Sequence, residues 1–235
     1  MNFSIKKLVS IVSAVLAAGS VSAVLPVSAM DESMMKADNE LYDGAFTYEN
    51  IDGSYKIVHC DAIIVTEIPA SRNGVAITAI GDNAFANKTA ISTLEIPDSV
   101  KSIGENAFYG CTGLTEVKLP KRLEYLGKNA FMCCNSLESI EIPDTLTTVP
   151  AYSFSMCDHL KSVTLPDTIT EIGDCAFYEC SSLTSITLPE GVTSIGAGAF
   201  SGCSGLASIT VSADNPYFAS ENDCCLSKNK TTLIF

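Results

Sequence analysis

The sequence has few basic residues, only two histidines and no tryptophan. It carries 14 Lys and Arg against 27 Asp and Glu, a formal net charge of −13. Nucleic acids and anionic membrane surfaces are bound through clustered Lys and Arg that replace counterions, so this balance argues against both as partners. The absence of tryptophan also removes the largest aromatic platform on which a sugar ring can stack.

Apolar residues are plentiful, by contrast. They make up 47% of the 235 residues, which is ample for a core and excludes a disordered chain. The chain has 10 cysteines. That is about 4% of the residues, below the roughly 8–10% typical of a small disulfide scaffold, so each cysteine has to be interpreted by its position.

The N-terminus has the pattern of a secretory signal peptide. Lys6 and Lys7 precede an apolar stretch too short for the roughly 20 residues of a spanning helix. We expect cleavage after Ala29, so that residues 1–29 are the signal peptide and residues 30–40 are a linker. No second long apolar run follows, and the mature protein is therefore expected to be secreted or on the cell surface, without membrane insertion.

From Phe85 onward the sequence repeats every 23 residues without an insertion. Leucine, phenylalanine and cysteine recur in separate columns, and a unit reduces to L-x-x-I-x-L-P-x-x-V-x-x-I-G-x-x-A-F-x-x-C-x-x. The columns are Leu114, Leu137, Leu160, Leu183 and Leu206; Phe85, Phe108, Phe131, Phe154, Phe177 and Phe200; and Cys111, Cys134, Cys157, Cys180 and Cys203. A repeat of this length, which cannot bury its apolar residues alone, predicts a solenoid whose stacked coils share one core.

Each unit contains two β-like stretches. The first, such as residues 186–188, is stopped by Pro189, which cannot donate to a ladder. The second, residues 192–195, ends at Gly196, which we expect to supply a turn. The Ala-Phe pair that follows is expected to form a turn of helix or 3₁₀-helix with its ring in the coil interior. The fold class is thus a β-rich repeat solenoid with short parallel strands.

These motifs resemble the BspA-like class of bacterial leucine-rich repeats, over roughly residues 41–235. The likeness is carried by Leu-x-x-Ile-x-Leu-Pro followed by Ile-Gly-x-x-Ala-Phe-x-x-Cys. The resemblance implies a right-handed leucine-rich-repeat coil on an exported or surface protein, associated with adhesion and protein binding. It implies no catalytic residues.

The first and last parts of the mature chain depart from the repeat. Residues 41–67 are expected to be an N-terminal cap built on a β-hairpin, because Asp52-Gly53 is a strong hairpin signal. Residues 68–211 form the predicted solenoid. Residues 212–235 are expected to form a terminal turn and hairpin with its bend at Lys228-Asn229-Lys230, and since the chain stops at apolar Phe235 we expect it to be truncated.

One unit inside the solenoid is irregular. Pro150 stands where other units have glycine, and Ser153 where they have alanine. We expect a local bend in that unit.

The cysteine column predicts a ladder of buried free thiols, since cysteine behaves as a small hydrophobe in interiors. Disulfides between neighbouring coils and a metal ladder are the alternatives. One disulfide among the remaining cysteines stays open; these are Cys60, Cys133, Cys175, Cys224 and Cys225. A Cys157–His159 nucleophilic pair is disfavoured because Cys157 occupies the inward column. We therefore predict no catalytic, cofactor-binding or metal-binding residues.

Solvent-facing positions are where a binding function would lie, because a repeat exposes the same column many times. The residue between the two inward residues of each first strand is Glu95, Lys118, Glu141, Thr164, Thr187 or Thr210. Alternating charges in the first half predict pairing between neighbouring strands. Aromatic candidates for partner contact are Tyr109, Tyr125, Tyr152 and Tyr178, although ordinary half-buried packing is the favoured interpretation for them.

The function indicated is an exported, non-catalytic binding or adhesion module. Its partner is expected to be a protein on a host or bacterial surface. The alternatives are a carbohydrate-binding accessory module that takes a polysaccharide and a passive structural spacer that binds nothing.

Overall fold

The computed structural model describes residues 35–36, 40–221 and 224–227, which form β-strands joined by turns, with no helix among them. The predicted signal peptide, most of the linker and the chain end at Phe235 lie outside the described residues. The strands are β1 (Met35–Lys36), β2 (Glu40–Tyr42), β3 (Phe46–Ile51), β4 (Ser54–Cys60), β5 (Ser71–Arg72), β6 (Val75–Ile80), β7 (Thr93–Glu95), β8 (Ser102–Ile103), β9 (Glu116–Lys118), β10 (Tyr125–Leu126), β11 (Ser139–Glu141), β12 (Thr148–Val149), β13 (Ser162–Thr164), β14 (Glu171–Ile172), β15 (Ser185–Leu188), β16 (Ser194–Ile195), β17 (Ser208–Val211), β18 (Phe218–Glu221) and β19 (Cys224–Ser227).

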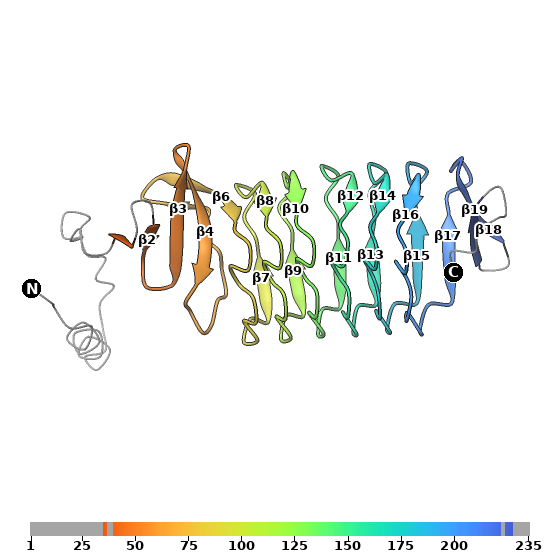
Figure 1. The fold of residues 1–235 in the computed structure, drawn as a ribbon, viewed down its shortest axis with the longest axis horizontal. Helices are drawn as coiled ribbons and strands as arrows, with labels where there is room; N and C mark the ends of the chain where they lie inside the picture. The colour runs from red at the N-terminus through yellow and green to blue at the C-terminus, as the bar shows by residue number, and fades with distance from the viewer. Residues whose placement is uncertain (1–34, 37–39, 222–223, 228–235) are drawn as a thin grey trace, which may run out of the picture. The chain divides into compact units, whose positions relative to one another are not determined.

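The predicted solenoid is confirmed, with about seven turns. Each repeat coil supplies a first strand (β7, β9, β11, β13, β15 or β17) and, in all but the last, a second strand (β8, β10, β12, β14 or β16), and successive coils lie side by side in chain order (Figure 1). Strands that pair between coils are parallel and one repeat apart, as in Glu95↔Lys118 and Glu171↔Ser194. The sequence period is therefore also the hydrogen-bonding register.

The core is a set of columns, of which the phenylalanine column is the clearest. Its rings are almost fully buried. From Phe85 to Phe200 they stack on one another, with centroids 5.0 to 5.7 Å apart. Leucine and cysteine columns are buried beside them. Each ring thus depends on its neighbours in adjacent coils for burial, which couples the coils into one core.

The segment around the Ala-Phe pair is a run of turns, so the prediction of a helical turn was wrong. Its N–H groups alternate between two kinds of acceptor. Phe108 donates to Ala130 of the next coil at 2.8 Å, whereas Tyr109 donates back to Asn106 at 3.0 Å. In a helix every one of these N–H groups would donate within its own coil. Here half of them donate to the neighbouring coil instead.

The glycine that follows each second strand does not supply the positive-φ turn that was expected of it. Its φ is not positive, and its need for glycine comes from close backbone approach: a Cβ on Gly127 would lie 2.4 Å from the carbonyl carbon of Gly104. The left-handed turn conformations are adopted at two other columns, mostly by residues other than glycine. These are Asn83, Asn106, Asn129, Tyr152, Cys175 and Gly198, and Asn87, Gly110, Cys133, Met156, Glu179 and Gly202.

Pro150 interrupts this arrangement in the irregular unit, where the local bend stays a prediction. The equivalent Gly127 and Gly173 each donate an N–H to the preceding coil, to Ile103 and Val149, at 2.8 Å. Proline has no N–H, so the carbonyl of Leu126 loses this donor. The sheet accordingly ends at β10, and β12 begins a separate one.

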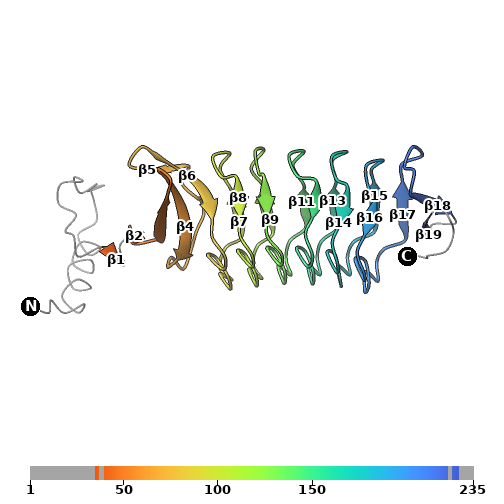
Figure 2. The ribbon, with the colours of Figure 1, turned by 45° about the horizontal axis from the view of Figure 1, so that its top comes forward.

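The N-terminal hairpin cap is confirmed. β3 and β4 pair antiparallel around Asp52-Gly53. β4 then pairs parallel with β6, and β6 pairs parallel with β8 (Figure 1, Figure 2). At the other end β18 pairs antiparallel with β19. Their connection lies between Glu221 and Cys224, and the residues predicted to form the bend, 228–230, lie outside the described residues.

Removing one ring of the stack should be costly. We expect Phe154→Ala to lower the free energy of unfolding by about 3–5 kcal/mol, since it truncates a fully buried aromatic between two partner rings. Urea denaturation measures this change. A change near zero would show that the ring is not shared between coils.

A second prediction separates close approach from turn formation. Gly127→Ala should lower the free energy of unfolding by about 1–3 kcal/mol, because the new Cβ meets backbone. Pro150→Ala, the control at the equivalent position, should change it by less than about 1 kcal/mol: it restores a donor for Leu126 but loosens the unfolded chain. Equal effects of the two changes in urea denaturation would refute the proposed reason for glycine.

Candidate binding surfaces

The first-strand face is the surface that the repeat presents most regularly. Glu95, Lys118, Glu141, Thr164, Thr187 and Thr210 are all exposed, and with the exception of Val163 and Leu165, which are half-buried, the residues on either side of them are buried. Pairing places Glu141 beside Thr164 and Thr187 beside Thr210. Because every other side chain points inward, these residues form one solvent-facing row.

Charged residues along this face pair across coils, as predicted. Lys118 forms an ion pair with Glu95, which raises the pKa of Lys118 by hydrogen bonding and by its charge. Lys161 reaches Glu138 at 3.0 Å. All four side chains are well exposed to solvent, so these pairs contribute little to stability. They involve none of the threonines in the row.

The tyrosines do not form one surface. Tyr125 lies on β10 and is 51% exposed; Tyr152 is 42% exposed in a left-handed turn. Tyr109 and Tyr178 are half-buried, which agrees with ordinary half-buried packing, the interpretation favoured from the sequence. Burial raises and Tyr109 lowers the pKa of Cys133, and Glu179 raises the pKa of Tyr178, so both tyrosines lie close to neighbouring side chains.

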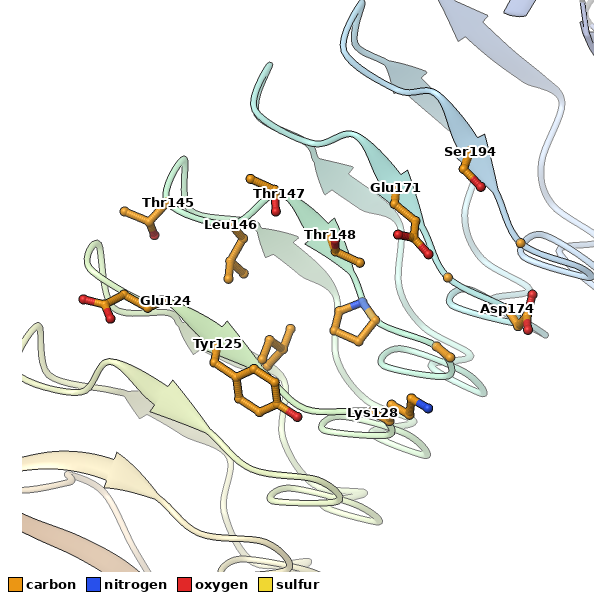
Figure 3. Close-up of a pocket in the computed structure, with 15 residues that line it drawn as sticks. Glu124, Tyr125, Lys128, Thr145, Leu146, Thr147, Thr148, Glu171, Asp174 and Ser194 are labelled. Atoms are coloured by element: carbon orange, nitrogen blue, oxygen red, sulfur yellow. The ribbon is translucent and has the colours of Figure 1, made fainter. Parts of the chain in front are cut away.

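Open grooves occur in the described part of the chain where strand pairing is interrupted. One, of about 650 Å³, lies between β9 and β11 and includes Lys118, Glu141 and Thr164 of the first-strand row. Another, of about 610 Å³, lies between β10 and β12 at Pro150, with Tyr125 on one wall (Figure 3). The sequence predicted the irregular unit but neither groove; the proline in a glycine column marks only the groove at Pro150.

The buried thiol ladder is confirmed: the column cysteines Cys111, Cys134, Cys157, Cys180 and Cys203 are buried and free. Each column thiol donates to a phenylalanine carbonyl of the preceding coil, as Cys157 does to Phe131 at 3.3 Å. Burial raises the pKa of Cys157 and raises that of Cys111 to about 12. His159 is exposed and bonds to the Asn135 carbonyl at 2.7 Å. Burial keeps the thiols of Cys111, Cys134 and Cys157 protonated rather than nucleophilic.

Metal-binding clusters and membrane-spanning helices are both absent from the described part of the chain. No group of three or more His, Cys, Asp or Glu side chains there is arranged to hold a metal ion. Nor does that part contain a helix with the length and apolar character needed to cross a membrane.

Comparisons with known proteins agree with this architecture. The BspA type leucine-rich repeat region, in 6 copies, matches residues 78–207 and 126–228. A leucine-rich cell surface protein of Faecalibacterium prausnitzii A2-165 is 30% identical with a TM-score of 0.64, covering 83% of this chain and 60% of that one. The present chain thus spans less than two thirds of that relative.

Two further solved structures are similar. The T. pallidum leucine-rich repeat protein is 27% identical with a TM-score of 0.51, covering 73% of this chain and 71% of that one. The pneumococcal vaccine antigen PcpA is 23% identical with a TM-score of 0.66, covering 86% and 56%. The latter likeness shows the fold alone. A search of curated proteins finds no match.

The thiol ladder predicts a pH dependence of stability. The pKa of Cys111 rises from 9.0 when unfolded to about 12 when folded. The protonated thiol of Cys111 contributes its full share to the free energy of unfolding below pH 9. This share is lost as the pH rises toward 12, because in that range only the unfolded chain ionises the thiol. Between pH 9 and pH 12 the free energy of unfolding of the wild type should fall with pH more steeply than that of Cys111→Ala, by about 1.4 kcal/mol per pH unit, because of proton linkage. Urea titrations at pH 8 to 11 test this; parallel slopes would contradict it.

Proposed function

The chain belongs to the BspA-type leucine-rich repeat proteins, and from this premise we propose that it is an exported, non-catalytic binding or adhesion module for a protein on a host or bacterial surface. The observation that carries the proposal is the first-strand row, in which one solvent-facing position recurs from Glu95 to Thr210 on a shared backbone frame. Such a row offers a partner several equivalent contacts at once.

The threonine half of the row is the part best suited to contact. Thr164, Thr187 and Thr210 are exposed, and none of their side chains is held by an ion pair. Short hydroxyl side chains lose little conformational entropy on binding and can both donate and accept hydrogen bonds. In the other half of the row, Lys118 and Glu95 would have to give up their ion pair before either could contact a binding partner.

Export and surface location are part of the proposal. Residues 1–29 would be the signal peptide, 30–40 the linker, 41–67 the cap, 68–211 the solenoid and 212–235 the terminal segment. The cell-surface description of the F. prausnitzii relative supports this location.

A carbohydrate-binding module is the second candidate, favoured by one observation. The ring of Tyr125 is 51% exposed beside an open groove, where it could stack on a pyranose face. The absence of tryptophan and the larger regular surface of the first-strand row place this candidate second.

A pull-down from host and bacterial surface extracts tests the proposal. The immobilised protein should capture a specific protein, and Thr187→Arg should reduce capture at least about tenfold by placing a bulky charge in the row. Ser201→Arg, at an exposed turn position outside the row, is the matched control and should retain capture.

Three other outcomes would overturn the assignment. Equal loss with both variants would point away from the first-strand row. Retention on polysaccharide arrays with no captured protein would favour the carbohydrate module. Recovery of neither a protein nor a polysaccharide would favour the passive structural spacer.

A further inference from the structure

Positive charge is confined to one part of the solenoid. From residue 162 to residue 221 the sequence has no lysine or arginine, while it has seven acids: Asp167, Glu171, Asp174, Glu179, Glu190, Asp214 and Glu221. The preceding coils instead pair lysine with glutamate, as in Lys101–Glu124 at 3.0 Å. The later coils therefore carry a negative potential that no internal cation offsets.

Two of these acids line the groove at Pro150. Glu171 lies on β14 and Asp174 on the turn that follows, and both are exposed (Figure 3). The side chain of Glu171 makes no hydrogen bond or ion pair within the described residues, although its backbone N–H donates to Thr147. Asp174 uses Oδ1 to accept the Ala197 N–H at 2.7 Å, which leaves Oδ2 available. Two carboxylates thus face the groove with unused acceptor capacity.

The opposite wall is aromatic. Tyr125 lies one repeat before Thr148 and two repeats before Glu171, in the same column of second strands, and half of its surface is exposed. Lys128 lines the groove on the Tyr125 side, and Glu124 there is already paired with Lys101. A cation entering the groove would therefore be directed away from Lys128, toward Glu171 and Asp174.

The groove is a fixed feature of the fold. Pro150 cannot restore the ladder to Leu126, yet the two coils stay joined at their turns, where Asn129 donates to Ala151 at 3.2 Å and Phe131 donates to Ser153 at 2.9 Å. These bonds leave no room for an inserted strand, so a ligand has to enter with its side chains.

We propose that this groove docks a cationic segment of the protein partner, with Lys or Arg side chains held between the Tyr125 ring and the carboxylates of Glu171 and Asp174. The ring face attracts a cation, the carboxylates accept charge-assisted hydrogen bonds, and the acidic coils beyond draw the segment in. The inference rests on the proposed protein-binding function but uses a different surface from the first-strand row.

Fluorescence anisotropy with a labelled peptide of eight alternating Lys and Thr residues tests this. The peptide should bind the protein, and a matched Glu-Thr peptide should not. The double variant Glu171→Gln, Asp174→Asn should weaken binding by about tenfold or more, since both carboxylates lose their charge. Tyr125→Ala should weaken it by about threefold or more.

The matched control removes the same amount of charge elsewhere in the acidic coils. Glu190→Gln, Asp214→Asn should bind within about twofold of the wild type, because neither residue lines the groove. Pro150→Gly, which supplies both the missing donor and the residue of the regular column, should close the groove and abolish binding. Retained folding of each variant is checked by its urea midpoint.

Equal weakening by both double variants would mean attraction to overall charge only and would overturn the inference. Retained binding by the Pro150→Gly variant would do the same, as would binding of a neutral hexasaccharide in place of the cationic peptide. None of these results affects capture of a partner through Thr187, so failure here is distinguishable from failure of the proposed function.

Discussion

The close, in-register approach of successive coil backbones is the constraint on which the structure depends. Coils are joined by parallel strand pairs and by alternate N–H groups of the turns, so that each residue lies beside its equivalent one repeat away. That spacing explains why a ring must stack on a ring, and why a Cβ is excluded at Gly127. It also explains why the column thiols are buried with a backbone carbonyl as their acceptor.

Departures from the repeat are what give the solenoid individual surfaces. Pro150 removes one donor and opens a groove, and the same unit places Tyr152 in a left-handed turn where the earlier units have asparagine. A non-glycine residue other than asparagine is uncommon in that conformation. Regular positions thus build the frame, while the irregular unit places an exposed aromatic ring beside acidic coils.

Much of the fold could be predicted from the sequence because the period determines both register and burial. Burial of the columns that contain Phe154 and Cys157 could be predicted from their 23-residue spacing alone. Gly127 was assigned to the right place for the wrong reason, since spacing cannot distinguish a positive φ from close approach. The turn around the Ala-Phe pair is too short for periodicity to separate helix from turn. Exposure of Tyr109 and the groove at Pro150 depend on contacts between coils, which the order of residues alone does not show.

The most direct test of in-register stacking compares two deletions. Removing residues 160–182, one full repeat, should leave a chain that unfolds cooperatively, because every later column still meets its equivalent. Removing residues 161–182, one residue fewer, should prevent cooperative folding, because it moves every later side chain out of its column. Thermal unfolding followed by circular dichroism distinguishes them. Similar transitions for the two deletions would contradict the account.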